Sequence, residues 1–347
     1  MKNKKKLLFL TRLYLPHGGG VEKHVYEISK ILSVKYQITI VTEQHDKNLL
    51  EHEICPEAEI YRIPVFNISE KFKKFVIWKW IWLHRQLFLT TNIIHIHDVF
   101  FWYLPIRLLY LSSNSYMTFH GYENVNGPNP IQKFWHQLAA VLTKGNICIG
   151  GFHAKWYGVI PTYTSFGAVD IQLQKQLKRS NKAIYIGRLA EDTGVMSYLE
   201  SVRFSLMSLD VYGAGPLQNQ AKKFVADNKL PVSFFGFVPK ASASIEKYQI
   251  SFTSGYLGIL ESLLSQTPVV SYYQSALKKD YLYETPFSKF IKIVHSPQEI
   301  AKATSEILQN PTSMKEAVQS GYNWAREQTW DQMCSLYLKL WQEPQLV

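Results

Sequence analysis

The sequence predicts an α/β protein made of two doubly wound halves, each with a parallel sheet between layers of helices. Three observations lead to this class. The chain has 347 residues, which suits two domains of ordinary size better than one. Short apolar runs alternate with segments of helical periodicity up to residue 150, and the alternation starts again at residue 183. Turns rich in glycine or other small residues follow several of the apolar runs.

The composition predicts large cores and an anionic partner. Hydrophobic residues make up 46% of the chain, charged residues 19% and aromatic residues 14%, which excludes a disordered chain. The formal net charge of +11 favours nucleic acid, anionic lipid or a phosphorylated small molecule. We do not expect nucleic acid, because the sequence has no helix-turn-helix, zinc or RNP-like signature.

The cysteines and the first residues bear on the compartment. Cys55, Cys148 and Cys334 stand far apart without a Cys-x-x-Cys pair, which argues against a structural zinc and fits a reducing compartment. The first 16 residues are basic, but their apolar run is brief and broken by Arg12, so they predict a strand rather than a signal peptide. No apolar run reaches the ~18–20 residues that span a bilayer.

In the first half, a buried-strand pattern over residues 7–13 leads into Gly18, Gly19 and Gly20 and then into a helix that ends at Leu32. Glycines at a helix start let backbone N–H groups approach an anion, although such turns also serve simple chain reversal. Further strands are predicted over residues 36–42, 59–64, 92–97, 115–119 and 146–150.

Residues 71–86 predict an amphipathic helix that combines three tryptophans with five basic residues. A basic, tryptophan-rich helix suits an anionic membrane interface, where aromatic rings lie at headgroup depth. The alternative is a core helix with a basic outer face, because Phe75, Trp78, Trp82 and Leu83 also recur at helical spacing.

Two of the predicted strands end in histidine. His97, followed by Asp98, ends the strand over residues 92–97, and His120 follows the strand over residues 115–119. Ligand sites of doubly wound sheets collect at the carboxyl ends of strands. A lone histidine there is more often structural, but two at matching strand ends predict imidazoles on one rim.

In the second half, residues 161–182 are polar and rich in lysine and glutamine, which predicts an interdomain connector. Strands over residues 183–186, 209–212 and 232–235 each end in a turn that contains glycine. Helices are predicted over residues 296–309, 313–328 and 330–341, and we expect the last one to pack back across the first domain.

Residues 251–272 predict a short strand, a Gly-Tyr turn, a helix and a second strand. Glu261 lies in that helix beside Leu260, Leu263 and Leu264. A buried carboxylate is costly unless it is hydrogen-bonded or paired, and a ligand rich in hydroxyl groups would supply the partner. The alternative is that Glu261 lies at the edge of the apolar face and points to water.

Seven motifs, in order, resemble the retaining glycosyltransferases of GT-B fold in family 4. They are LPHGGGVEKHVYEISKIL, IIHIHD, TFHG, GRLAEDTG, VYGAGPL, FFGFV and GILESLLSQTPVV, and they cover nearly the whole chain. The resemblance implies two Rossmann-like domains that face each other across a cleft. The predicted parts are an acceptor domain over residues 1–165, a donor domain over residues 166–329 and a C-terminal helix over residues 330–347.

The resemblance also implies roles for individual residues. On the acceptor side, His120 matches a histidine near the reacting sugar, and His97 lies on the acceptor rim. Glu261 matches the second acid of a Glu-x7-Glu signature, which bonds the nucleotide ribose, and Arg188 matches the arginine that neutralises the leaving diphosphate. The remaining implied donor contacts are Gly18, Gly19 and Gly20 at the diphosphate, Gly213, Gly215 and Pro216 near the nucleotide, Phe237 and Val238 at the base, and Thr193, Tyr256 and Leu257.

Two positions depart from the family pattern. Thr253 stands where the first glutamate of the signature meets the donor sugar, and Thr193 stands where a lysine normally supplies a second cation. Losing one contact to a leaving group can lower the rate by ~10²–10³. Arg188, the Gly18–Gly20 amides, Lys182 or Lys240 are candidates to compensate.

By resemblance, we expect sugar transfer from a nucleotide-sugar to a glycan or lipid-linked acceptor, such as a growing cell-envelope polysaccharide, with retention at the anomeric carbon. The leaving diphosphate itself takes the acceptor's proton in that picture, and no metal or other cofactor is expected. Residues 71–86 suggest a cytoplasmic protein that is peripheral on the inner face of the membrane.

Two alternatives stay open. A catalytically degenerate nucleotide-sugar-binding protein, or a partner subunit of another transferase, would explain Thr193 and Thr253 directly. A nucleotide-sugar epimerase of the same fold would need further acids near the sugar, and the first domain offers few beyond Asp98 and Glu123.

Overall fold

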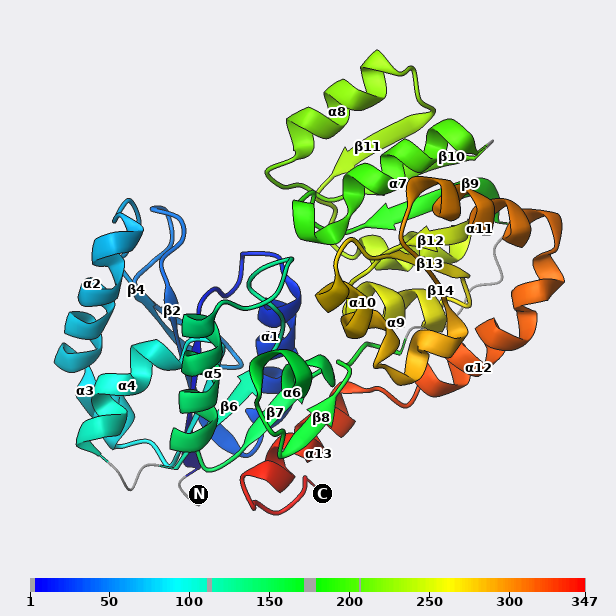
Figure 1. The fold of residues 1–347 in the computed structure, drawn as a ribbon. Coiled ribbons are helices and arrows are strands. Elements are labelled where there is room, and N and C mark those ends of the chain that lie inside the picture. Colours follow the sequence, from blue (N-terminus) through cyan, green and yellow to red (C-terminus); the bar gives the residue numbers. More distant parts are fainter. Residues whose placement is uncertain (1–3, 111–113, 172–178, 206, 347) are drawn as a thin grey trace. The chain divides into compact units, whose positions relative to one another are not determined.

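The computed structural model describes residues 4–110, 114–171, 179–205 and 207–346 (Figure 1). The chain forms two compact units. Unit 1 consists of Met1–Tyr122, Pro128–Ser165 and Trp330–Val347, and unit 2 consists of Glu123–Gly127 and Phe166–Thr329.

Unit 1 is built on a sheet in which the described strands follow the order β3-β4-β2-β1-β5-β6-β7-β8, with β3 alone antiparallel to its neighbour. The chain runs outward from β1 through β2 to β4 and then returns to β5 on the other side of β1. This reversal creates a switch point between β1 and β5, where doubly wound sheets bind ligands. The strands are β1 (Lys5–Thr11), β2 (Tyr36–Glu43), β3 (His52–Ile54), β4 (Glu59–Ile63), β5 (Ile93–His97), β6 (Ser115–Phe119), β7 (Asn146–Ile149) and β8 (Tyr163–Ser165).

The helices of unit 1 pack in groups. In one, α2 contacts α4, α4 contacts α5, and α5 contacts α6; in another, α1 packs against α13, the last helix of the chain. A capping box at Asn129 fixes the start of α5. The helices are α1 (Gly20–Leu32), α2 (Glu70–Leu83), α3 (Arg85–Leu89), α4 (Phe100–Leu109), α5 (Pro130–Leu142), α6 (Phe152–Tyr157) and α13 (Trp330–Leu340).

The predicted helix over residues 71–86 is two helices in the structure, because the chain breaks at His84. The Nδ1 atom of His84 lies 2.9 Å from the carbonyl oxygen of Trp80, and the two rings stack with their centroids 3.9 Å apart. The Trp80 carbonyl oxygen therefore contacts both the backbone N–H and the ring of His84 at the end of α2.

Unit 2 contains a fully parallel sheet of the order β11-β10-β9-β12-β13-β14 in the described residues. The chain moves outward from β9 to β11 and then returns to β12 beside β9, which places a second switch point between β9 and β12. The strands are β9 (Ser180–Ile186), β10 (Ser208–Tyr212), β11 (Val232–Gly236), β12 (Tyr248–Phe252), β13 (Val269–Tyr272) and β14 (Lys292–Val294).

The connector predicted over residues 161–182 is shorter than expected. Tyr163–Ser165 pairs with β7 as strand β8, and β9 starts at Ser180. Residues 172–178 of the predicted connector lie outside the described residues.

The helices of unit 2 are α7 (Val195–Ser201), α8 (Gln218–Asp227), α9 (Tyr256–Leu264), α10 (Ala276–Tyr283), α11 (Pro297–Gln309) and α12 (Lys315–Ala325), with 3-10 turns over Glu191–Thr193, Val202–Phe204, Ala241–Lys247, Pro286–Phe290 and Pro311–Met314. Helix α7 packs against α8 and α11, and α9 packs against α12. The hydroxyl groups of Ser275 and Ser296 cap the starts of α10 and α11.

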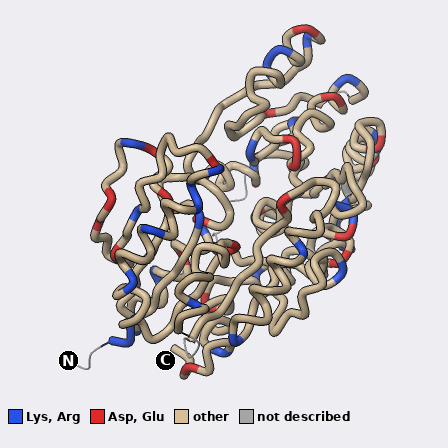
Figure 2. The backbone as a smooth tube through the Cα atoms, turned by 60° about the vertical axis from the view of Figure 1, so that its left-hand side comes forward, with Lys and Arg blue, Asp and Glu red and all other residues tan. Residues whose placement is uncertain are grey.

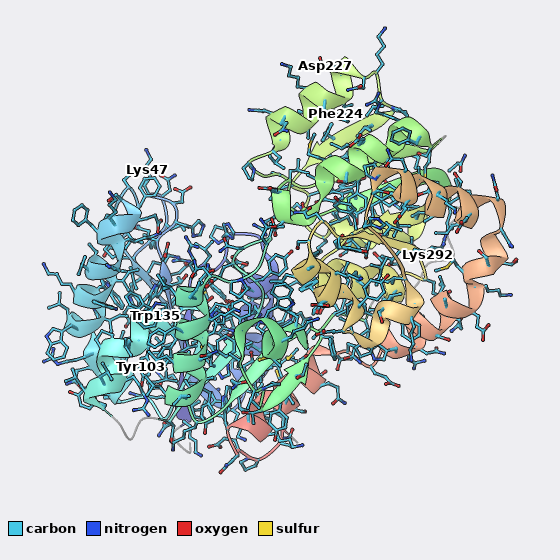
Figure 3. The ribbon with its side chains drawn as sticks, viewed as in Figure 1. Lys47, Tyr103, Trp135, Phe224, Asp227 and Lys292 are labelled. Atoms are coloured by element: carbon cyan, nitrogen blue, oxygen red, sulfur yellow. The ribbon has the colours of Figure 1, made fainter. Side chains whose placement is uncertain are left out.

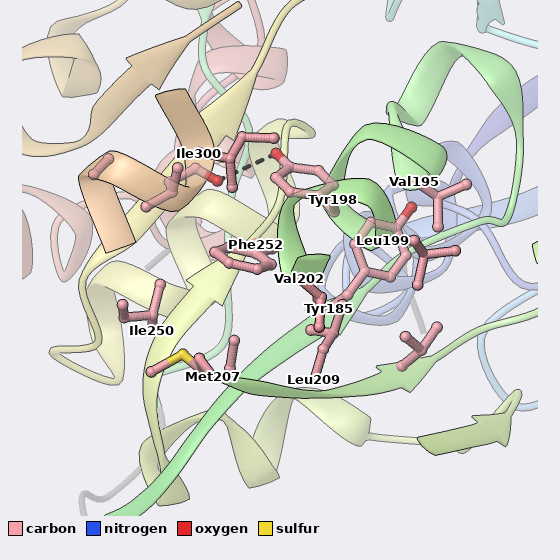
Figure 4. Close-up of a cluster of buried hydrophobic side chains, with 14 of the residues drawn as sticks. Tyr185, Val195, Tyr198, Leu199, Val202, Met207, Leu209, Ile250, Phe252 and Ile300 are labelled. Carbon is pink, nitrogen blue, oxygen red and sulfur yellow. Dashed lines mark hydrogen bonds between the residues drawn. The ribbon is translucent and has the colours of Figure 1, made fainter. Parts of the chain in front are cut away.

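Buried side chains of α7 and of the central strands form the core of unit 2 (Figure 4). The ring of Tyr198 stacks on that of Phe252 with centroids 5.1 Å apart, and its hydroxyl group lies 2.7 Å from the Oγ atom of Ser254. Tyr198 thereby ties α7 to the loop that follows β12. This contact fixes the loop after β12, which lies at the switch point of unit 2.

Lysine and arginine positions are scattered along the chain (Figure 2). Among the described residues, no helix is both long enough and apolar enough to cross a membrane.

Candidate functional site

A cluster of histidines lies at the switch point of unit 1. Because β5 and β6 are adjacent and parallel, the residues that end them meet at one edge of the sheet. The Nδ1 atom of His97 lies 2.8 Å from the Nε2 atom of His120. The ring of His24, on α1, stands perpendicular to that of His120 with centroids 4.8 Å apart. The structure thus brings the two predicted histidines together and adds His24 to them.

A second row of hydrogen bonds lies behind the cluster. The indole N–H of Trp341 donates to Nδ1 of His95 over 3.0 Å, so neutral His95 carries its proton on Nε2 and donates to Oγ1 of Thr118 over 2.7 Å. The hydroxyl group of Tyr337 lies 2.8 Å from Thr118 Oγ1 and 2.8 Å from Nε2 of His24. Tyr337 of α13 and Trp341, which directly follows this helix, therefore fix the histidines of unit 1.

The histidines of this cluster are neutral near pH 7. Burial lowers the pKa of His24 to about 3. Burial and the neighbouring histidines hold the pKa values of His95, His97 and His120 well below 6.5. A neutral imidazole can donate or accept a hydrogen bond without adding charge to a site. The Nε2 atom of His97 is buried and has no hydrogen-bond partner in the described part of the chain.

Three of these residues could hold a metal ion. His24, His97 and His120 each offer a nitrogen atom within 4.8 Å of the other two. Tetrahedral zinc holds its nitrogen ligands about 3.3 Å apart, since Zn–N bonds are about 2.0–2.1 Å long. The rings would have to rearrange to bind zinc, and the hydrogen bond between His97 and His120 would have to break.

The glycine loop of unit 1 faces an acid of its own helix. Gly19 caps the start of α1, and a Cβ atom there would clash with the carboxylate of Glu22. Glu22 is buried, and its Oε1 atom lies 2.8 Å from Nδ1 of His17. Gly20 has open space around its Cα atom, and Gly18 precedes this pair. An anion that approaches this helix start has to share it with Glu22, which sequence reasoning missed.

At the switch point of unit 2, the turn after β9 carries Arg188 and Thr193. The side chain of Arg188 is 62% exposed, and its Nη2 atom lies 2.8 Å from Oδ2 of Asp192. The Thr193 hydroxyl group donates to the carbonyl oxygens of Arg188 and Ala190 over 3.0 and 2.7 Å. Thr193 therefore shapes the turn, and the guanidinium group is held in an exposed position by Asp192.

The glycines of the turn after β10 pack against the turn after β9. Gly213 has a φ of 143°, and a Cβ atom on it would collide with the carbonyl oxygen of Gly187. A Cβ atom on Gly215 would lie 2.5 Å from the carbonyl oxygen of Leu189. These two glycines let the backbones of the two turns meet, and Pro216 follows them. After β11, Phe237 and Val238 are 66% and 38% exposed.

Helix α9 carries the other predicted donor contacts. Tyr256 is buried, its hydroxyl group donates to the carbonyl oxygen of Tyr281 over 2.7 Å, and the two rings stack. Leu257 and Glu261 are half-buried. Thr253, directly after β12, is buried with its Oγ1 atom against Gly258.

Sequence reasoning missed Lys278. This lysine of α10 is only 5% exposed, and its Nζ atom donates to the carbonyl oxygen of Ser254 over 2.7 Å. The signal was its spacing, because Lys278 and Leu282 are four residues apart on the apolar side of α10.

Comparison with known proteins supports the fold. Residues 18–157 match the sequence model of Glycosyltransferase Family 4. No curated protein matches the sequence significantly. Among solved structures, sucrose-phosphate synthase from Thermosynechococcus elongatus has a TM-score of 0.79 at 13% identity, over 97% of this chain and 98% of that one.

Two further solved structures cover nearly the whole chain. HepE from Anabaena, in complex with UDP and glucose, has a TM-score of 0.73 at 13% identity, over 96% of this chain and 98% of that one. A glycosyltransferase from Rickettsia africae has a TM-score of 0.69 at 14% identity, over 97% of this chain and 98% of that one. The chain therefore has the GT-B fold of the glycosyltransferases, and its residues 18–157 are similar to Glycosyltransferase Family 4.

Proposed function

We propose that this protein transfers a sugar from a nucleotide-sugar to a glycan or lipid-linked acceptor with retention at the anomeric carbon. One observation carries the proposal: in each unit, the candidate residues gather at the switch point of the sheet. His97 and His120 do so in unit 1, and Arg188 does so in unit 2. Such switch points are where doubly wound sheets bind ligands.

In unit 2, the proposed ligand is the nucleotide part of the donor. Arg188 stabilises the diphosphate, and Glu261 accepts hydrogen bonds from the ribose. The exposed backbone beside Phe237 and Val238 contacts the base. The HepE complex contains UDP and glucose in a protein of the same fold, which supports a nucleoside diphosphate as ligand.

In unit 1, neutral His120 hydrogen-bonds a hydroxyl group of the reacting sugar or of the acceptor, and His97 fixes the orientation of that ring. During transfer, the bond between the anomeric carbon and the diphosphate oxygen breaks, and its electron pair leaves with the diphosphate. The acceptor oxygen bonds to the anomeric carbon, and its proton passes to the diphosphate. A histidine with a low pKa suits this scheme, because it orients oxygen atoms without becoming a competing cation.

Thermal unfolding with a panel of nucleoside diphosphates and their sugars tests this proposal. A ligand that binds only the folded state raises Tm by mass action. At a concentration of 100 times its Kd, it raises the free energy of unfolding by about 2.7 kcal/mol. We expect one nucleotide-sugar to raise the Tm of the wild type and to lose this effect in Glu261→Ala. The matched control is Glu306→Ala, which removes an exposed acid of α11 and should respond like the wild type.

A panel without any stabilising nucleotide would contradict the proposal. A nucleotide-sugar could also stabilise the protein while no tested acceptor leads to release of nucleoside diphosphate. That outcome would instead favour a degenerate binding protein or partner subunit. Thr193 and Thr253 are the residues that would explain such an outcome.

We propose an anionic membrane surface as a further partner of unit 1. Helix α2 buries Ile77, Trp80 and Ile81, whereas Phe72, Phe75, Trp82 and Leu83 are 65%, 55%, 47% and 63% exposed. Exposed lysines, Lys71, Lys74 and Lys79, lie on the same helix. One face of α2 packs in the core, but it is not the face of Phe75, Trp82 and Leu83 that the core alternative expected. The rest of the helix offers apolar and basic side chains together.

Neighbouring helices extend this surface. The ring of Phe101 on α4 lies 4.7 Å from that of Trp78 on α2 and 4.9 Å from that of Trp135 on α5, so an aromatic row joins three helices. In Figure 3, the label of Trp135 marks α5 and that of Tyr103 marks α4, two of the three helices in this row. Helix α4 exposes Leu108 and Leu109, and α5 exposes Ile131, Phe134 and Val141. Apolar side chains and lysines on adjacent helices match the headgroup region of an anionic bilayer, so the protein would act peripherally on the cytoplasmic face.

Sedimentation with vesicles that contain phosphatidylglycerol tests this surface. We expect Lys71, Lys74 and Lys79 changed together to Glu to weaken vesicle binding at least tenfold, because each basic residue contributes about 1 kcal/mol near an anionic surface. Lys73 is left unchanged, because it pairs with Glu43. Phe204→Ser, at an exposed apolar residue of unit 2, is the control. Equal binding of the triple variant and the wild type would exclude this surface.

A further inference from the structure

Lys278 is a buried lysine at the switch point of unit 2. Its Nζ atom lies 2.7 Å from the carbonyl oxygen of Ser254 and 4.0 Å from the centroid of the Tyr281 ring. An ammonium group has three N–H donors and is strongly hydrated in water, so burial of this side chain is costly. The carbonyl oxygen and the ring face offset part of that cost.

The fold brings Lys278 to the same edge as Arg188. Strands β9, β12 and β13 are neighbours in the sheet and run parallel, so the segments that follow them meet at one edge. Arg188 follows β9, Ser254 follows β12, and α10 follows β13. A further bond ties these segments, since Nε2 of Gln274 donates to the carbonyl oxygen of Glu191 over 2.9 Å.

The charges around Lys278 belong to the turn after β9. Burial lowers the pKa of Lys278 to about 7, while Asp192 raises it and Arg188 lowers it further. Two cations, Arg188 and Lys278, thus interact with the carboxylate of Asp192, and Arg188 pairs with it. A site with this excess of positive charge favours an anion, and a perturbed lysine in such a place is typical of a functional site.

Thr193 leaves room for this role. Thr193 is uncharged, so it contributes no cation to the switch point, and its hydroxyl group donates to the carbonyl oxygens of Arg188 and Ala190. A diphosphate carries more negative charge than one guanidinium group neutralises, and the charge grows as the sugar leaves. Preorganised cations at that position stabilise the transition state.

We propose that Lys278 is the second cation of the diphosphate site in unit 2, acting together with Arg188 in place of a basic residue at position 193. This inference rests on the proposed function, since it requires a nucleoside diphosphate at this switch point. The Lys278 ammonium group binds the non-bridging oxygens of the diphosphate and stabilises the charge left on it when the bond to the sugar breaks.

Binding measurements on Lys278→Met test the inference. The probes are UDP, GDP and ADP, because the base is unassigned, together with the nucleoside of whichever diphosphate binds the wild type. We expect Lys278→Met to weaken binding of that diphosphate by ~10–100-fold, which corresponds to the loss of a charge-assisted contact. Binding of the nucleoside should change by less than twofold. Lys279→Met, which removes the exposed neighbouring lysine, should bind both like the wild type.

A purely structural role of Lys278 would weaken nucleoside and diphosphate alike, so the ratio of the two affinities separates the roles. The double variant Lys278→Met with Thr193→Lys adds a second readout, because a cation restored at position 193 should recover at least fivefold in diphosphate affinity. The same recovery is expected in turnover.

The outcomes are distinct. Wild-type protein that binds no nucleoside diphosphate overturns both the proposed function and this inference. A wild type that binds a diphosphate, beside a folded Lys278→Met that binds it equally tightly, overturns the inference alone. A diphosphate affinity that Thr193→Lys does not improve refutes the equivalence of the two positions. If Lys278→Met does not fold, Lys278→Gln replaces it under the same criteria.

Discussion

Unit 1 is expected to lose about 4 kcal/mol of stability between pH 7 and pH 5 through His24 and His153, or about 2 kcal/mol for each, and His95 and His97 add to this loss. All four histidines are at most 4% exposed. Burial lowers the pKa of His24 to about 3 and that of His153 to about 4, and those of the other two lie well below 6.5.

The sign follows from proton uptake. In the unfolded chain these histidines bind protons as the pH falls below 6.5, whereas in the folded unit they stay neutral until a much lower pH. Their contribution is fully present above pH 6.5 and is lost as the pH falls toward the folded pKa values. Because a domain is stable by only about 5–15 kcal/mol, this loss is a large fraction of the stability of unit 1.

Tryptophan fluorescence during urea unfolding at pH 7, 6 and 5 measures this effect, because eight of the nine tryptophans, all but Trp324, belong to unit 1. The variant His153→Asn is the internal control. Its amide can donate to the Gly150 carbonyl oxygen as Nδ1 does, but it cannot titrate, so its loss should be smaller by about 2 kcal/mol. Equal urea midpoints at pH 7 and pH 5 would contradict the assignment of neutral buried histidines.

Replacing Arg188 with Ala is expected to lower turnover by ~10²–10³, the effect of removing one preorganised group from developing charge. The guanidinium group is exposed and held by Asp192, so its loss should leave the fold of unit 2 unchanged. The expected change is in kcat, because the charge on the diphosphate is largest as the sugar leaves.

Release of nucleoside diphosphate from a saturating donor measures this change. Arg203→Ala removes another exposed arginine of unit 2 and serves as the control. A kcat within threefold of the wild type would remove Arg188 from the reaction. Partial recovery in Arg188→Lys is expected, since a lysine restores the charge without the planar fork.

The sequence predicted the central strands well, because fully buried parallel strands are continuous apolar runs. The predicted and observed bounds agree at Ser115–Phe119 and differ by one residue at Tyr36–Glu43. The edge strands β3, β8 and β14 were missed, because each has three residues and is too short for a periodic pattern.

The histidine rim was predictable from strand ends, but its supports were not. His24 and Tyr337 are 313 residues apart in the sequence, and His95 and Trp341 are 246 apart. Local patterns carry no record of such pairs. The burial of Lys278 was open to a local pattern, because its spacing from Leu282 places it on the buried side of α10, whereas the adjacent Lys279 is exposed.

Helix α13 bears on how the chain matures during synthesis. It follows unit 2 in the sequence, yet Tyr337 and Trp341 complete the hydrogen bonds of unit 1. A ribosome that adds about 5–20 residues per second needs roughly 10–30 s to translate the stretch between Ser165 and Trp330. Throughout that interval the nascent unit 1 keeps the surface that α13 will cover open to water and to chaperones. The amino-terminal half of this protein is therefore the last to be finished.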